Sequence, residues 1–173
     1  RQAAGPMDYT QGAMRNATRG SHYICNSEPM SQGTRAHQLA LYMILDSPLN
    51  MLCDSPSNYE QEQECTDFIA GVPTVWDETE VLQGEMGEYI VTARRKGTDW
   101  YVGGITDWTP RDIEVSFGFL PDGEYEAEIF ADGVNAHRAA SDYRRSRETV
   151  NRHTNKKLHL APGGGFAIKL KKK

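Results

Sequence analysis

The distribution of apolar and polar residues divides the chain near residue 70. Before this point the strongest pattern is GTRAHQLALYMILDSPL, residues 33–49, where apolar residues recur at steps of three and four. The pattern predicts a helix with Thr34 as its N-cap, ending at Asp46-Ser47-Pro48 because the residue before proline disfavours helical backbone. The helix is apolar on nearly every side, so we expect it to be buried on several sides.

After residue 70, short segments alternate between apolar and polar residues with a period of two. Residues 113–117, IEVSF, and 124–130, EYEAEIF, alternate most clearly, and each has one charged or polar face. The other predicted strands are residues 88–95, 100–106, 157–160 and 165–170. Turn sequences such as KGTD, LPDG and APGGG separate them. Antiparallel strands with one face in water and frequent turns predict a β-sandwich.

The first 70 residues do not form a complete domain by this pattern. AGPMDYTQGAM, residues 4–14, is typical of a buried strand that ends in a turn. One strand cannot cover an apolar helix, and an unpaired strand leaves its backbone polar groups unsatisfied. The chain also begins with Arg1 rather than Met. We therefore expect a piece of a longer protein, in which the helix face formed by Leu39, Tyr42 and Met43 is exposed when the piece stands alone.

Composition and charge disfavour some classes of function. The 173 residues are 38% apolar and 25% charged, as is typical of a globular protein. A net charge of −5, without a basic stripe between aromatic residues, disfavours nucleic-acid binding. No apolar segment approaches the roughly 20 residues of a membrane span. Cys25, Cys53 and Cys65 match no zinc motif, and both one disulfide and three free thiols remain open.

Acidic residues at two places in the chain could bind or cleave a substrate. Asp8 lies where the predicted first strand meets a turn, and an acid at the carboxyl end of a barrel strand is often a substrate ligand. The alternative is a side chain that caps the turn. Asp77, Glu78 and Glu80 follow Trp76, and glycoside hydrolysis needs two acids about 5–10 Å apart. Because neighbouring strand residues point to opposite faces, a charged linker is the favoured interpretation.

Aromatic and histidine residues leave further alternatives. Trp100, Tyr101 and Trp108 could stack against sugar rings, but Trp100 and Tyr101 are neighbours on one strand, which favours packing in the core. His37 lies on the apolar helix, so a hydrogen-bonded core histidine is favoured over a metal ligand or base. The triplet that begins at Asn16 fits the glycosylation acceptor pattern.

Four stretches, in this order and spacing, resemble the carboxyl-terminal end of glycoside hydrolase family 97. They are AGPMDYTQGAM, GTRAHQLALYMILDSPLNMLCDSPSNYE, FIAGVPTVWDETEVLQGEMGEYIVTARRKGTDWYVGGITDWTPRD and APGGGFAIKL. The resemblance implies a mixed fold. Residues 1–70 would be the incomplete end of a catalytic (β/α)8 barrel, with its last strand at 4–12 and its last helix at 34–46. Residues 75–173 would be a carboxyl-terminal antiparallel β-sandwich, often described as an oligomerisation domain.

The resemblance also implies a parent enzyme, a calcium-dependent α-glucosidase or α-galactosidase that is periplasmic or secreted. The family's catalytic acids and calcium ligands have no counterpart in this sequence, so it implies no catalytic and no metal-binding residue here. Asp8 and Tyr9 would lie near the sugar pocket and are the candidate substrate-binding residues.

The implied partners are the rest of the barrel, an oligosaccharide substrate and a second copy in a homo-oligomer, with neither nucleic acid nor membrane among them. Two alternatives without catalysis remain open. One is a carbohydrate-binding or adhesion sandwich, and the other is a pure interaction domain.

Overall fold

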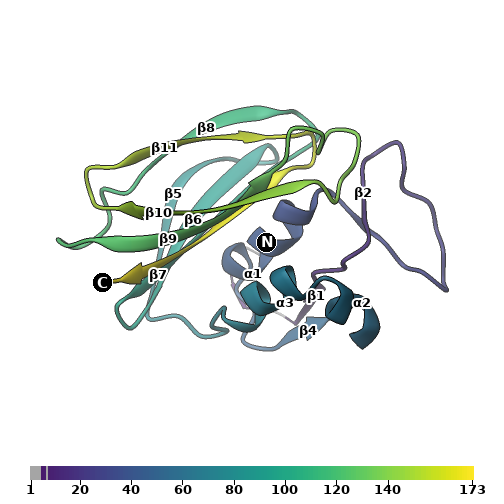
Figure 1. Cartoon of the computed structure of the whole chain (residues 1–173), viewed down its shortest axis with the longest axis horizontal. Helices are drawn as coiled ribbons and strands as arrows, with labels where there is room; N and C mark the ends of the chain where they lie inside the picture. Colours follow the sequence, from purple (N-terminus) through teal and green to yellow (C-terminus); the bar gives the residue numbers. More distant parts are fainter. Residues whose placement is uncertain (1–4, 7) are drawn as a thin grey trace.

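The computed structural model describes residues 5, 6 and 8–173, and its central element is a six-stranded antiparallel sheet (Figure 1). The strand order is β10-β9-β12-β7-β6-β5. The strands are β5 (Glu78–Glu85), β6 (Tyr89–Lys96), β7 (Asp99–Thr106), β9 (Tyr125–Asp132), β10 (Tyr143–Val150) and β12 (Gly165–Lys172).

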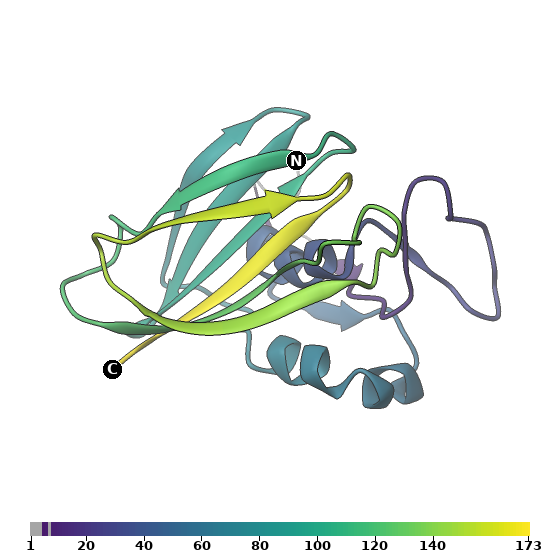
Figure 2. The same ribbon diagram turned by 45° about the horizontal axis from the view of Figure 1, so that its top comes forward.

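A second layer of two antiparallel strands, β8 (Arg111–Ser116) and β11 (Asn155–Leu160), covers one face of this sheet (Figure 2). The main hydrophobic core lies between the two layers. Ile113, Val115 and Phe117 point into it, and so do Tyr125 and Ile129, as their alternation predicts. The predicted β-sandwich is therefore confirmed.

A helical layer covers the other face of the six-stranded sheet. It contains α1 (Arg35–Ile44), α2 (Pro56–Gln61) and α3 (Gln63–Ala70). Helix α1 lies across β7 and β12, and α3 packs beside it, where the rings of Phe68 and Phe130 are 4.6 Å apart. The predicted N-cap is confirmed, because the Thr34 hydroxyl accepts a hydrogen bond from the backbone N–H of His37 at 3.1 Å.

The predicted exposure of Leu39, Tyr42 and Met43 is wrong. Each of these residues is at most 3% exposed, because the sheet and α3 cover the helix within this chain. The error comes from treating one face of the sheet as fully solvated. On β9, Glu126 is exposed, but Phe130 on the same face is buried under α3.

A small parallel sheet joins the helical layer. β1 (Tyr9–Gln11) pairs in parallel with β4 (Asn50–Leu52), and α1 connects the two strands. A second short parallel pair, β2 (Asn16–Ala17) with β3 (Ser31–Gln32), lies at the base of a loop that extends from the body (Figure 1). Within the described residues, no helix is long and apolar enough to cross a membrane.

The predicted division of the chain near residue 70 stays a prediction. Helices α1 and α3 share one hydrophobic cluster with the helical-layer face of the sheet. The two parts are therefore joined by a common core rather than by a bare linker.

Candidate functional site, the seat of helix α1 on the sandwich

The two candidate substrate-binding residues lie at the start of β1. The described strand begins at Tyr9, Asp8 comes directly before it, and Asp8 is exposed while Tyr9 is half-buried. The prediction that Asp8 lies where the strand ends is wrong for the described strand, which begins after it. Burial raises the pKa of the Tyr9 hydroxyl. Substrate binding by these two residues stays a prediction.

The acidic group after Trp76 is used in strand pairing. The Asp77 carboxylate accepts hydrogen bonds from Lys96 Nζ at 3.0 Å and from the backbone N–H of Gly97 at 2.7 Å. Glu78 pairs with Arg95 at 2.9 Å. These contacts fix β5 against β6, as the linker interpretation expects, and occupy both acids with basic or amide partners.

The aromatic residues also have structural places. Trp100 is 3% exposed and packs against Phe119 in the main core. Tyr101 points to the opposite face and meets Trp76 edge to face, with ring centroids 5.2 Å apart. Core packing is therefore confirmed for this pair. All three cysteines are free thiols.

The amino end of α1 is held by the sandwich. The Thr34 hydroxyl donates a hydrogen bond to Asp132 Oδ1 at 2.6 Å, and the Thr34 N–H donates to the Gly163 carbonyl at 2.9 Å. The Arg35 N–H donates to the Ala140 carbonyl at 2.7 Å. The first N–H groups of a helix have no partner within the helix. Here the turns of the sandwich supply some of those partners.

Asp132, at the end of β9, is the centre of this junction. Its second carboxylate oxygen accepts from the backbone N–H groups of Ala161 at 2.8 Å and Gly165 at 3.0 Å. Burial raises the pKa of Asp132 to about 6, against the lowering effect of these hydrogen bonds. Nearby, His37 Nδ1 lies 3.2 Å from the Gly164 carbonyl, and burial lowers the pKa of His37 to about 4. His37 is therefore neutral and hydrogen-bonded at pH 7, as the favoured interpretation expects, although it is half-buried rather than part of the core.

The carboxyl end of α1 is held by Arg94 on β6. The guanidinium donates to the Ile44 carbonyl at 3.0 Å, lies 3.6 Å from Asp46 and sits over the Trp76 ring. The arginine side chain is only 3% exposed. A cation is favoured at a helix carboxyl terminus because the last carbonyls are unpaired and carry partial negative charge.

Lys169 on β12 holds the carboxyl end of α3 in the same way. Its ammonium group donates to the Phe68 carbonyl and lies 4.3 Å from the centre of the Phe68 ring. Burial lowers the pKa of Lys169 to about 8. Neither α1 nor α3 has a basic residue in its own last turn, so the sheet supplies the cation for each helix.

Arg35 links three further segments. Its buried guanidinium pairs with Glu62 at 2.9 Å and also contacts Asn16 and the Met14 carbonyl, next to β2. It lies 6.0 Å from the centre of the Tyr143 ring on β10. The contacts join the loop after β1 to the start of α3 and to the edge of the sheet.

The segments that follow β1 and β4 form a polar pocket of about 310 Å³. Its lining residues are Met14, Arg15, Glu28, Asn58, Gln61 and Glu62. The charges are paired, since Arg15 contacts Glu28 and Arg35 contacts Glu62. Among the residues that the structure describes, no group of three or more His, Cys, Asp or Glu could hold a metal ion.

Sequence reasoning missed the residues that hold the helices. Arg94 and Lys169 each lie inside a predicted strand, at positions whose alternation places them on the same face as Ile90 and Ala167. A charged residue on a face that packs against helices was the available signal. Asp132 gave no such signal, because it follows its predicted strand and its partners lie in distant turns.

Comparison with known proteins identifies the family. Residues 75–171 match the family model described as glycosyl-hydrolase 97 C-terminal, oligomerisation. A retaining alpha-galactosidase from Bacteroides thetaiotaomicron is 66% identical over 171 residues, which are 99% of this chain and 26% of that protein. A probable retaining alpha-galactosidase from Streptomyces bingchenggensis is 28% identical over 133 residues, 77% of this chain and 19% of that protein.

Solved structures agree with this match. A glycoside hydrolase family 97 enzyme from Pseudoalteromonas sp. strain K8, in complex with acarbose, has a TM-score of 0.78 and 39% identity, covering 82% of this chain and 23% of that one. A beta-arabinopyranosidase, at 22% identity and a TM-score of 0.77, covers 98% of this chain and 26% of that one and shows the same fold. The chain thus spans about a quarter or less of these relatives. Because the family model matches more than half of its residues, the chain belongs to the glycosyl-hydrolase 97 C-terminal family.

Proposed function

We propose that this chain is the carboxyl-terminal part of a retaining glycoside hydrolase that acts on α-linked galactosides or glucosides, and that its own role is structural. The proposal is supported by 66% identity to a retaining alpha-galactosidase over 99% of the chain. In this account the sandwich supports the end of the catalytic barrel. The catalytic acids and any calcium ligands belong to the preceding part of the longer protein, and a periplasmic or secreted location stays a prediction.

The strand–helix–strand unit supports the barrel part of the proposal. β1 and β4 are parallel and joined through α1, and parallel strands occur almost only in α/β folds whose sheets are covered on both faces. The apolar residues around β4 lack such cover, since Leu49, Met51 and Leu52 are 57%, 43% and 50% exposed. We infer that β1 and β4 are the last two strands of the barrel, so two strands contribute rather than the single one expected.

The observation that carries the structural role is that the sandwich holds α1 at both ends. Asp132 and the turn before β12 bind its amino end, and Arg94 binds its carboxyl end. A helix held in this way fixes the strands on either side of it. In a barrel those strands end in the loops that form the substrate pocket.

Hydrolysis assays on two proteins test this function. We expect the purified 173-residue chain to release no nitrophenol from nitrophenyl α-galactoside or α-glucoside with calcium present. The longer protein should cleave at least one of them. Turnover by the isolated chain that scales with its concentration would contradict the structural role.

The family description favours one further role, pairing of subunits through residues 75–171. We propose that the longer protein is a homo-oligomer, which light scattering across a concentration series tests. A carbohydrate-binding sandwich is less well supported, because Trp100 and Tyr101 are buried in separate clusters. Quenching of tryptophan fluorescence by maltooligosaccharides, abolished by Trp108→Ala, would support that alternative.

A further inference from the structure

An apolar groove of about 540 Å³ lies on the sheet near α1, at the hairpin formed by β5 and β6. Its apolar lining consists of Val81, Met86, Tyr89, Ile90 and Ile105, together with Gly84 and Gly87. Ile90 and Ile105 are register partners on β6 and β7 and pack against the helix-side cluster. The groove therefore opens mainly on the face of the sheet that carries α1 and α3, while Tyr89, which packs against the main core, closes its hairpin end.

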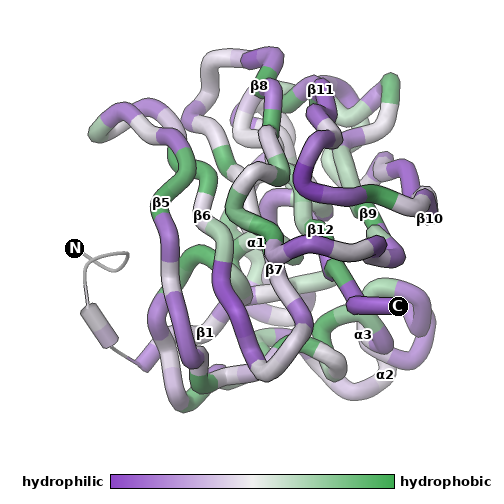
Figure 3. Tube along the Cα trace, turned by 90° about the vertical axis from the view of Figure 1, so that its left-hand side faces the viewer, coloured by the Kyte–Doolittle hydropathy of each residue, from purple (hydrophilic) through white to green (hydrophobic). Residues whose placement is uncertain are grey.

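The helices cross the sheet in a regular order. Helix α3 contacts Phe130 on β9 and Lys169 on β12, and α1 lies across β12 and β7. The groove comes next, over β6 and β5, on the side of α1 away from α3. Figure 3 shows this end of the molecule, with β5 and β6 on one side of α1 and the α2–α3 segment on the other.

The spacing of the groove suits a helix. A Cβ on Gly103 of β7 would lie 2.8 Å from the Ala40 carbonyl, so the backbone of α1 rests directly on β7. The edge strand β5 is two strands away, roughly 10 Å at the spacing of neighbouring strands. Packed helices lie about 8–10 Å apart, so a helix beside α1 would fall over the groove.

The order of strands and helices along the chain predicts the same position for an additional helix. Helix α1 follows β1, α3 follows β4 through α2, and β1 pairs with β4. If strands and helices continue in step, the unit before β1 adds a strand beside β1 and a helix beside α1. That helix would occupy the position of the groove.

We propose that this groove seats the barrel helix that directly precedes β1 in the longer protein. The inference rests on the proposed function, because it takes β1 and β4 as barrel strands. Relatives about four times as long supply the chain for such a helix, since this sequence covers only 26% of the alpha-galactosidase. The helix would present an apolar face to Ile90, Ile105 and Val81.

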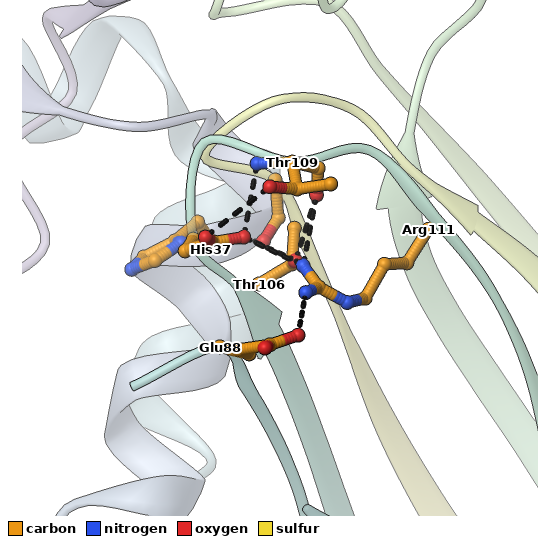
Figure 4. Close-up of polar contacts among 7 residues, drawn as sticks. His37, Glu88, Thr106, Thr109 and Arg111 are labelled. Atoms are coloured by element: carbon orange, nitrogen blue, oxygen red, sulfur yellow. Dashed lines mark hydrogen bonds and ion pairs between the residues drawn. The ribbon is translucent and has the colours of Figure 1, made fainter. Parts of the chain in front are cut away.

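The charges at one end of the groove are already paired. Figure 4 shows Arg111 reaching Glu88, Thr106 and Thr109, with His37 of α1 beside this cluster. Arg111 Nη1 lies 2.7 Å from Thr106 Oγ1 and 2.6 Å from Asp107, and Nη2 contacts Glu88. Because Asp107 and Glu88 are neutralised in this way, Glu85 is the remaining acid in the lining, and the groove fits a helix face that is mainly apolar.

Methionine oxidation tests the proposal directly. Met86 lines the groove and is fully exposed in this chain, so hydrogen peroxide should oxidise it at the rate of a free peptide. In the longer protein we expect oxidation of Met86 to slow by about tenfold or more, independent of protein concentration. Equal rates in the two proteins would overturn the proposal, and protection that grows with concentration would assign the groove to a second copy instead.

Variants separate this inference from the proposed function. Val81→Lys places a charge in the groove and should lower the Tm of the longer protein by several degrees, while the isolated chain changes little because Val81 is 65% exposed in it. Val134→Lys is the matched control, since Val134 is 92% exposed and lies outside the groove lining. Equal Tm shifts for the two variants would contradict the proposal. Loss of the proposed function would appear separately, as absent hydrolysis by the longer wild-type protein.

Discussion

The hydroxyl of Thr34 donates a 2.6 Å hydrogen bond to the carboxylate of Asp132, although 98 residues separate them in the sequence. The same hydroxyl caps α1 by accepting from the His37 N–H. One threonine therefore begins the helix and attaches it to the sandwich. In contacts of this kind the sheet supplies the hydrogen-bonding partners that the ends of the helices lack.

Replacing Thr34 with valine should destabilise the chain by about 1–3 kcal/mol, because it removes a helix cap and leaves Asp132 without one donor. Urea unfolding followed by circular dichroism measures the effect. Thr98→Val is the control, since Thr98 lies in an exposed turn, and it should change stability by less than about 0.5 kcal/mol. Equal losses of unfolding free energy for the two variants would show that the contact between Thr34 and Asp132 does not stabilise the chain.

Replacing Arg94 with methionine should cost about 1–3 kcal/mol, because the Ile44 carbonyl loses its buried donor. The neighbouring Arg95 makes partly exposed ion pairs with Asp77 and Glu78, so Arg95→Met should cost less than about 1 kcal/mol. Chemical denaturation of both variants gives the comparison. An Arg94 variant no less stable than the Arg95 variant would rule out its role as the cap of α1.

Lys169 should make stability depend on alkaline pH. Burial lowers its folded pKa to about 8, below the ordinary value of 10.5, so the charged form is less favourable in the folded chain than in the unfolded chain even though the ammonium group caps α3. Stability is therefore greatest above pH 10.5 and falls as pH drops through 8. Unfolding free energy should therefore rise between pH 8 and 10.5 by up to about 3 kcal/mol from this group. Lys169→Met should flatten this rise in urea titrations at stepped pH. Parallel curves for the two proteins would contradict the assignment.

His37 should make the stability of the chain depend on pH in the acid range. Its pKa of about 4 lies below the ordinary 6.5, so its contribution is present above pH 6.5 and is lost as pH falls through 4. The pKa of Asp132 is raised to about 6, so its contribution has the opposite sign and is lost as pH rises through 6. Comparing wild type with His37→Gln at each pH isolates the histidine. If the difference in unfolding free energy between the two proteins stayed constant from pH 7 to pH 4, this role of His37 would be contradicted.

Much of the fold could be predicted because its pattern is local. Helix α1 and the strands β8 and β9 follow from the spacing of their own apolar residues. The edge strands β5 and β10 were missed, since the charged residues typical of an edge hide the alternation. Residues 54–64 are polar in sequence, yet residues 56–61 form α2 and residues 63–70 form α3, whose few buried residues include Tyr59, Cys65 and Phe68.

The site was harder to predict than the fold. Arg94 and Lys169 cap helices that lie 50 and 101 residues away in the chain, and no local pattern specifies such contacts. The burial of Leu39 and Met43 likewise depends on a sheet that the sequence shows only as separate strands. These features became visible once the sheet and the helices were placed together.

The structure of the longer protein that carries this chain tests the central claim most directly. Our account predicts that β1 and β4 are neighbouring strands of a closed parallel barrel, that α1 remains bound at its ends by Asp132 and Arg94, and that Leu49, Met51 and Leu52 are buried. A structure in which β1 and β4 keep free edges in solvent, and the 173 residues form a separate body away from any barrel, would contradict it.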